Sequence, residues 1–256
     1  MFNRTMLAIL FLSSGIGLAQ VGSDALLQAP TTLPIVFTRT VSADRSRVGD
    51  SVLARTSQSV RLANGAVVPS GTEITGHVVA ASPFVFVETP YASQKQASLS
   101  IQFDSLQLGG QTVPLNITVR AMADPIASWD ARMPNVNDDS SSPSVTQIGG
   151  DQLNPSQTKV VSMQGDIVAY DRSGGVYAHL IANRRCDASS VEVSVGIYSA
   201  SACGLYGFTD VSAQEVGSLA KPSTFTLISI RTSPKVWSHS TALLEVLPDR
   251  QTVAAR

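Results

Sequence analysis

Cys186 and Cys203 are the two cysteines of the chain, and their side chains can bond covalently to each other. In an exported protein, an even pair of cysteines predicts a disulfide. The bond would close a loop of about 17 residues and stabilise the fold by roughly 3 kcal/mol. The alternative is a reactive Cys203 thiol with His179 as its base, although a second cysteine so near is unusual for a catalytic thiol. We therefore predict the disulfide.

Asp50 and Asp166 are a second candidate for chemistry, because each follows a glycine and precedes an apolar strand start. Two carboxylates in equivalent turns could serve as a glycosidase pair, but aspartate after glycine is also ordinary turn chemistry. His77, His179 and His239 are isolated and lack the spacing of zinc ligands. The chain contains no Gly-x-Ser-x-Gly nucleophile motif. The sequence thus favours a protein that is not an enzyme and uses no metal or cofactor.

Tyr198, Tyr206 and Phe208 are aromatic residues close together in the sequence, and Trp237 follows later. Such side chains could line a surface that binds a carbohydrate or a peptide. Core packing accounts for aromatic residues in strands equally well. We keep Tyr198, Tyr206 and Phe208 as candidate ligand-binding residues, with core packing as the alternative.

Short β-strands must position these residues, and they are clearest between Val48 and Val119. Apolar and polar residues alternate in this block, which gives each strand one face for the core and one for solvent. The alternating sets are Ile74, Gly76 and Val78, then Leu99, Ile101 and Phe103. Tight turns are expected at Asn64-Gly65, Pro69-Ser70-Gly71 and Gly109-Gly110. This pattern predicts a mainly β fold, an antiparallel barrel or sandwich.

Residues 122–159 interrupt the β pattern. They are rich in Asp, Asn, Ser and Pro, and they predict a long disordered insertion or flexible linker. The linker divides the β structure into an N-terminal part, residues 20–121, and a C-terminal part with the disulfide loop, residues 160–250.

Three local predictions complete the list of elements. The apolar run Phe84–Val87 predicts a further strand. Residues 225–230 and 236–246 are expected to pair as a closing hairpin across Ser233-Pro234. The small-residue run Ser199–Gly204 is ambiguous and allows a helix.

The N-terminus indicates the compartment. Arg4 precedes a short apolar stretch, and Gly17-Leu18-Ala19 places small residues where a signal peptidase cleaves, so residues 1–19 are predicted to be a signal peptide. The stretch is too short for a comfortable transmembrane helix of roughly 20 residues. We therefore expect a periplasmic or secreted protein with no transmembrane segment after cleavage.

The charge balance bears on the partners. Only 14% of the residues are charged and the formal net charge is -1, so the chain has no overall bias toward nucleic acid. We expect envelope proteins or a second copy of the chain as partners, and no nucleic acid.

Three motifs carry a resemblance to a known family. They are Pro-x-Gly-Thr-x-Ile-x-Gly at 69–76, Phe103-Asp104-x-Leu106, and Gly-x-x-x-Pro at 110–114. With the strands around them, residues 48–120 resemble the C-terminal β-barrel of the VirB10/TrbI family, whose members are scaffold components of bacterial type IV secretion systems. The chain departs from that family in lacking its inner-membrane helix and Pro-rich stretch, and in being polar at 122–159 where the family has an outer-membrane helical hairpin.

The resemblance implies an envelope-type β fold with a structural or assembly role. Our leading hypothesis is therefore an exported, non-enzymatic cell-envelope protein of this kind. The alternative is a secreted or periplasmic module that binds a carbohydrate or a peptide.

Overall fold

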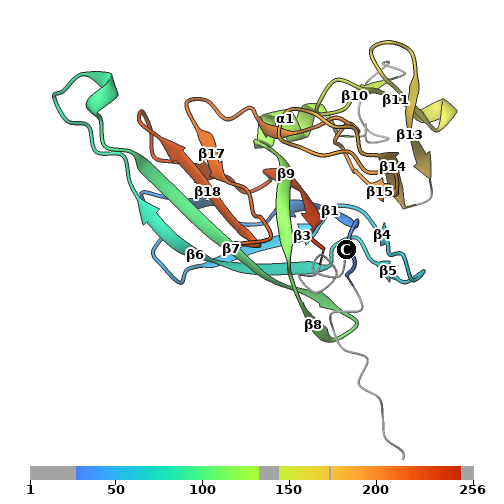
Figure 1. Cartoon of the computed structure of the whole chain (residues 1–256), viewed down its shortest axis with the longest axis horizontal. Coiled ribbons are helices and arrows are strands. Elements are labelled where there is room, and N and C mark those ends of the chain that lie inside the picture. Colours follow the sequence, from blue (N-terminus) through green and yellow to red (C-terminus); the bar gives the residue numbers. More distant parts are fainter. Residues whose placement is uncertain (1–26, 133–143, 173, 249–256) are drawn as a thin grey trace, which may run out of the picture.

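The computed structural model describes residues 27–132, 144–172 and 174–248. The chain is mainly β, with 47% of its residues in strands and 5% in helices. The predicted fold class is confirmed, because the largest sheet curls into a nearly closed barrel (Figure 1). Within the described ranges, no helix is long and apolar enough to cross a membrane. The predicted signal peptide, residues 1–19, lies outside the described residues.

The barrel sheet contains ten strands. Across the sheet they are β16 (Gly204–Tyr206), β9 (Ile117–Ala123), β20 (Thr241–Val246), β1 (Thr32–Phe37), β3 (Ser51–Thr56), β6 (Glu73–Ser82), β7 (Ala97–Leu108), β18 (Thr224–Ser229) and β17 (Ser212–Glu215), with β8 (Gln111–Pro114) also paired to β7. Of these pairings, only that of β16 with β9 is parallel.

The two ends of the barrel sheet approach each other near β9. The Val119 N–H donates to the carbonyl of Val216, which follows β17, at 2.6 Å. The inner faces of the strands fill the space between them with apolar side chains, where the Phe37 and Phe103 rings lie 6.2 Å apart between centroids. Phe37 lies on β1 and Phe103 on β7, so side chains of separate strands meet inside the barrel and make its interior a packed core rather than a channel.

The predicted strands and turns of residues 48–119 mostly form. Ile74, Gly76, Val78, Leu99, Ile101 and Phe103 are all buried, as their alternation predicts. β4 (Val60–Arg61) and β5 (Val67–Val68) pair around Asn64-Gly65, where Gly65 has a φ of +83° that its missing side chain permits. The turn at Gly109-Gly110 joins β7 to β8. The alternation of apolar and polar residues therefore identified the core-facing side of these strands correctly.

The second sheet is an antiparallel meander of six strands beside the barrel. Its strands are β10 (Val145–Thr146), β11 (Gln152–Asn154), β12 (Lys159–Val161), β13 (Ile167–Arg172), β14 (Gly175–His179) and β15 (Glu192–Ser194), with η3 (Pro155–Gln157) between β11 and β12. Leu153, Val160, Val193 and Val195 belong to its own apolar cluster.

Much of the segment 122–159 is structured, in contrast to the linker predicted for it. β9 extends to Ala123, and α1 (Pro125–Asp130) begins after Asp124, whose carboxylate accepts the Ala127 N–H at 2.8 Å as an N-cap. β10, β11 and the start of β12 follow. Residues 133–143 lie outside the described residues. Within residues 122–132 and 144–159, local capping and sheet pairing give structure where composition alone predicted disorder.

Two other local predictions differ from the structure. The predicted closing hairpin is wrong, because β18 pairs with β7 and β17, whereas β20 pairs with β9 and β1. Between them, β19 (Lys235–Val236) pairs with β2 (Val41–Ser42). Residues 199–203 contain one turn, at Ala200 and Ser201, rather than a helix, and β16 follows directly. β18 thus pairs with the strand before it and with the distant β7, whereas both neighbours of β20 come from distant parts of the chain.

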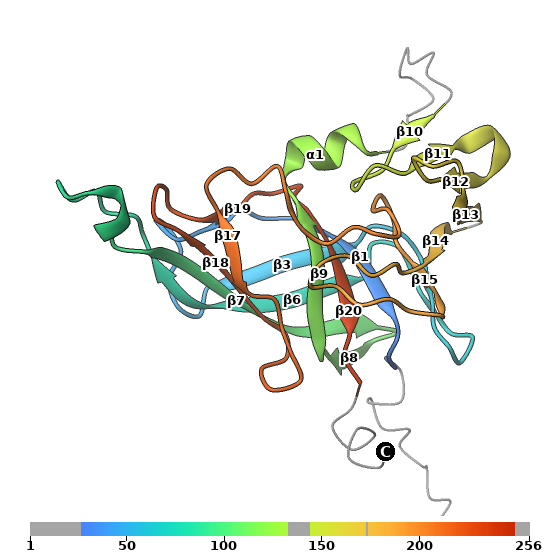
Figure 2. The same cartoon turned by 45° about the horizontal axis from the view of Figure 1, so that its top comes forward.

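The β6–β7 hairpin projects from the barrel as a long two-stranded ribbon (Figures 1 and 2). Residues 83–96 connect the strands at its end and include η2 (Tyr91–Ser93). Residues 84–87, predicted as a strand, belong to this loop and form no sheet. In both views the loop and the second sheet lie at opposite ends of the molecule.

Candidate functional site

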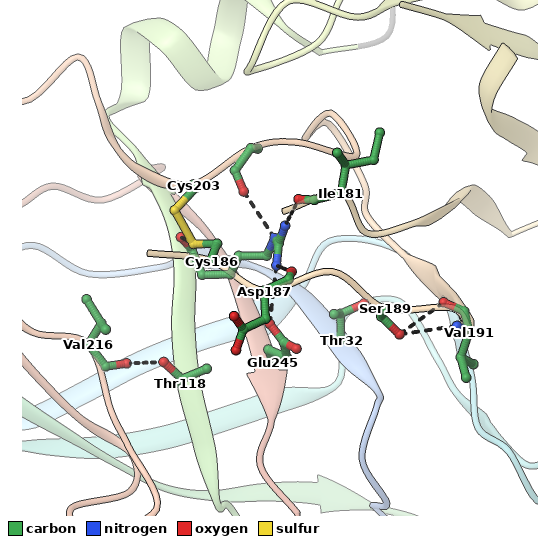
Figure 3. A network of polar contacts seen from close by, with 12 residues as sticks. Thr32, Thr118, Ile181, Cys186, Asp187, Ser189, Val191, Cys203, Val216 and Glu245 are labelled. Atoms are coloured by element: carbon green, nitrogen blue, oxygen red, sulfur yellow. Dashed lines mark hydrogen bonds and ion pairs between the residues drawn. A yellow bond between two sulfur atoms is a disulfide. The ribbon is translucent and has the colours of Figure 1, made fainter. Parts of the chain in front are cut away.

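Arg120, on β9, is a buried cation where the barrel meets the segment that follows β14. Its side chain is 0% exposed. The guanidinium donates to three backbone carbonyls, from Nε to Ala202 at 3.1 Å, from Nη1 to Asp187 at 2.7 Å and from Nη2 to Ile181 at 2.7 Å. Figure 3 shows Ile181, Asp187 and Glu245 around this point. We call this arrangement the clamp, because it holds residues 181–202 against the barrel.

The predicted disulfide between Cys186 and Cys203 forms beside the clamp (Figure 3). The two Cα atoms are 5.9 Å apart, which is an ordinary separation for a disulfide. Asp187 follows Cys186 and Ala202 precedes Cys203, so Arg120 bonds to both arms of the loop that the disulfide closes. β15 lies inside that loop, and its position therefore depends on both the covalent bond and the clamp.

Glu245, on β20, supplies the counter-charge of the clamp. Its Oε2 lies 3.6 Å from Arg120 Nη1, and its side chain is 23% exposed. Burial raises the pKa of Glu245, although the nearby guanidinium opposes this shift. Burial also lowers the pKa of Arg120, but an arginine titrates so far above neutral pH that it stays charged. Desolvation thus outweighs the attraction of this pair, and the carbonyl hydrogen bonds secure the guanidinium.

Gln58 joins the connection between β3 and β4 to the second sheet. Its Nε2 donates to the Val176 carbonyl at 3.2 Å and its Oε1 accepts the Val176 N–H at 3.2 Å. A Cβ at Gly175 would overlap the amide of Gln58 in this position, so the missing side chain of Gly175 leaves room for it. Gln58 also bonds to the Ser194 hydroxyl, and Thr32 Oγ1 donates to the Ser194 carbonyl. β14 and β15 are therefore fixed directly to the barrel.

A cavity of about 280 Å³ lies where residues 28–32, β4 and strands β13 to β15 meet. Its apolar lining comes from both sides and includes Val60, Leu62, Ala63, Val191 and Val193, with the ring of Tyr177. Arg172, which also lines it, pairs with Glu192 at 2.7 Å. Arg61 is exposed at the cavity and has no partner among the described residues. An apolar hollow with an unpaired cation suits an apolar group that has a carboxylate beside it.

The loop at the end of the β6–β7 hairpin exposes apolar side chains. Val85, Phe86, Val87 and Tyr91 are 60%, 72%, 45% and 64% exposed. We call these four residues the tip. Clustered exposure of this kind marks an interaction site more often than single apolar residues scattered over a surface.

A buried amide, that of Gln94, bonds to the backbone of the tip. Gln94 Nε2 donates to the carbonyls of Val87 at 2.6 Å and Thr89 at 3.1 Å, and its Oε1 accepts the Val87 N–H at 3.1 Å. At the base of the loop, the Phe84 N–H donates to Ser233 Oγ at 2.9 Å. The exposed apolar side chains are therefore presented on an ordered backbone.

The two candidate aspartates, Asp50 and Asp166, bond within different turns. Asp50 Oδ2 accepts the Arg47 N–H at 2.8 Å in the turn before β3 of the barrel sheet. The Asp166 N–H donates to Ser162 Oγ at 3.2 Å in the turn before β13 of the second sheet. The Asp50 carboxylate thus serves its own turn, whereas the Asp166 turn is held through the backbone of that residue. Within the described ranges, no group of three His, Cys, Asp or Glu side chains could hold a metal ion.

The histidine candidates are also accounted for locally. Cys203 has no free thiol to pair with His179, because its sulfur is bonded to Cys186, so that catalytic hypothesis is wrong for the oxidised protein. His179 is exposed on β14. His77 lies on the polar face of β6, where its Nδ1 is 2.8 Å from Asp104 Oδ2.

The three candidate aromatic residues have different surroundings. Tyr198 is a core residue, 1% exposed, and its hydroxyl lies 2.7 Å from Thr241 Oγ1, so it presents no ring to a ligand. The half-buried Tyr206 accepts the Cys203 N–H at its hydroxyl at 3.1 Å. Phe208 packs against Trp237 with ring centroids 5.9 Å apart. Core packing thus explains Tyr198, and the other two also make structural contacts.

Sequence reasoning missed both the clamp and the tip. A signal for the tip was present, because Pro83 and Pro90 bracket the apolar run and proline is excluded from central strands. A signal for the clamp was the single cation, Arg120, between Val119 and Ala121 in an apolar strand. A buried strand tolerates a charged side chain such as arginine only where hydrogen-bond acceptors surround its guanidinium.

No protein-family model, curated protein or solved structure matches the chain. The likeness of residues 48–120 to the VirB10/TrbI barrel therefore stays a prediction.

Proposed function

We propose that this chain is an exported, non-enzymatic protein of the cell envelope with an assembly role, and that it binds a protein partner through the tip. One observation carries the proposal: the tip is apolar, exposed and ordered at the end of a projecting ribbon. These exposed apolar side chains would leave water if they docked against another molecule.

The state of the tip favours binding. Because Gln94 already fixes the backbone of Val87 and Thr89, docking costs little further conformational entropy. Phe86 and Tyr91 are large exposed aromatic residues, a type enriched at the centres of interfaces. A small ordered contact with two aromatic anchors fits an assembly role.

Two further points support the location and the role. The Cys186–Cys203 disulfide is the kind of bond that persists in an oxidising compartment. The expected likeness to the barrel of a secretion scaffold agrees with a structural role, as does the turn bond that occupies the Asp50 carboxylate.

The alternative, a module that binds a carbohydrate or a peptide, draws its support from the cavity rather than from Tyr198, Tyr206 and Phe208. Its apolar lining and the unpaired Arg61 suit an apolar peptide side chain with a neighbouring carboxylate better than a sugar.

Affinity isolation from native envelopes tests the proposal with matched variants. Phe86→Asp places a charge in the tip, and Ile167→Asp places one at a residue of β13 that is 49% exposed. We expect Phe86→Asp to reduce the recovery of partner chains, including untagged copies of this protein, by roughly tenfold or more. Ile167→Asp should leave recovery unchanged. Equal recovery with both variants contradicts the proposal.

A further inference from the structure

We infer that the tip of one molecule binds in the cavity of a second copy, with Phe86 inside the cavity and Glu88 facing Arg61. This inference rests on the proposed function and names the partner as the same chain. The contact joins two surfaces that the fold places at opposite ends of the molecule.

Size favours this occupant. A dry apolar cavity of about 150 Å³ accepts benzene, so a cavity of about 280 Å³ has room for the ring of Phe86 and part of a neighbouring side chain. Phe86 is 72% exposed and stands among the apolar residues Val85 and Val87, which can cover the cavity mouth around it.

Charge favours it as well. Glu88 follows the apolar run of the tip, is exposed, and has no partner in the described part of the chain. Arg61, at the cavity, is likewise exposed and has no partner among the described residues, and its charge is opposite to that of Glu88. Docking Phe86 would bring an unpaired carboxylate toward an unpaired guanidinium, a match that steers the approach and fixes the orientation.

The cavity walls are preformed. Gln58 and Thr32 bond to Ser194 and so join β15 to the barrel. The disulfide closes the loop that contains β15, and the clamp fixes both arms of that loop. Both partners in the contact are therefore ordered before they meet, so little ordering entropy opposes the association.

The position of the two surfaces sets the type of assembly. The tip and the second sheet, which lines the cavity, lie at opposite ends of the molecule (Figures 1 and 2), so a chain cannot fill its own cavity. The contact is head-to-tail and repeats from copy to copy, either into a ring or into an open chain. One side chain in one cavity buries less area than a standard interface, so association is weak and depends on concentration.

Sedimentation velocity on the purified mature protein tests the inference with variants on both sides. Phe86→Asp disables the tip and leaves the cavity. Arg61→Glu reverses the charge at the cavity and leaves the tip, and Ala63→Trp fills the cavity mouth from an exposed position. We expect wild-type protein to associate with rising concentration, each of these three variants to associate at least tenfold more weakly, and Ile167→Asp to behave as wild type.

Mixing the variants gives a result that no other contact produces. Phe86→Asp and Arg61→Glu together contain one intact tip and one intact cavity, so an equimolar mixture should form a 1:1 complex that grows no further. The double swap Glu88→Arg with Arg61→Glu in one chain should restore self-association.

The outcomes separate this inference from the proposed function. Self-association that Phe86→Asp abolishes but Arg61→Glu and Ala63→Trp leave unchanged means that the tip binds elsewhere: the inference is overturned and the proposed function stands. A wild-type protein that stays monomeric at all concentrations also overturns the inference. Association unaffected by Phe86→Asp, with unchanged partner recovery from envelopes, overturns both.

Discussion

Replacing Arg120 by leucine should lower the free energy of unfolding by about 3–5 kcal/mol, the cost of removing one partner from a buried charged centre. The variant leaves the carbonyls of Ile181, Asp187 and Ala202 without their donor and Glu245 without its counter-charge. Arg120→Lys should be intermediate, because an ammonium group cannot reach three acceptors in a fork. Urea unfolding followed by tryptophan fluorescence measures the difference.

Glu245→Gln is the matched control for Arg120→Leu. Burial raises the folded-state pKa of Glu245 above its unfolded value, so its contribution to stability is fully present at low pH and is lost as pH rises through the folded pKa. Glutamine does not titrate, and the three carbonyl bonds to Arg120 remain. The variant should therefore be at least as stable as wild type at neutral pH. A loss comparable to that of Arg120→Leu would show that the ion pair, rather than the carbonyl bonds, holds the clamp.

Removing the disulfide should have the second largest effect. Changing both Cys186 and Cys203 to serine opens a loop that spans 17 residues, which costs about 3 kcal/mol. Because Arg120 bonds to both arms of this loop, the clamp and the disulfide stabilise the same segment. The losses from Arg120→Leu and from the double serine variant should then fall short of additivity by more than about 0.5 kcal/mol in the combined variant.

The loop that the disulfide closes contains β15, so removing the disulfide should also disturb the cavity that β15 helps to line. Val191 and Val193 lie between the two cysteines and line the cavity. The double serine variant should self-associate more weakly than wild type while its tip remains intact. Strictly additive stability losses and unchanged association would contradict the role of the clamp in placing β15.

The local pattern was sufficient for the barrel strands and the disulfide. A period of two identified the buried face of β6, and glycine turn chemistry located the hairpins around Gly65 and Gly110. These features depend on a few neighbouring residues. The pairing of β18 with β7, and of β20 with β1 and β9, joins strands far apart in sequence, and the expected hairpin between β18 and β20 was wrong.

The candidate site was harder to predict for the same reason. The clamp exists because β9 meets the segment after β14, and nothing near Arg120 in sequence shows that three carbonyls will surround it. Tyr198 and Phe86 show that aromatic type does not decide exposure. Tyr198 is in the core. Phe86 belongs to an apolar run that was predicted to be a strand, and it is exposed at the tip.

Photo-crosslinking from position 86 in intact cells tests most directly whether the tip is a contact surface. A photoreactive phenylalanine analogue replaces Phe86 in one strain and Ile167 in a second, so that the tip is compared with another exposed apolar position. The proposal predicts discrete adducts of higher mass from position 86, including an adduct of two copies, and none from position 167. Only monomer from position 86, or the same adducts from both positions, would contradict it.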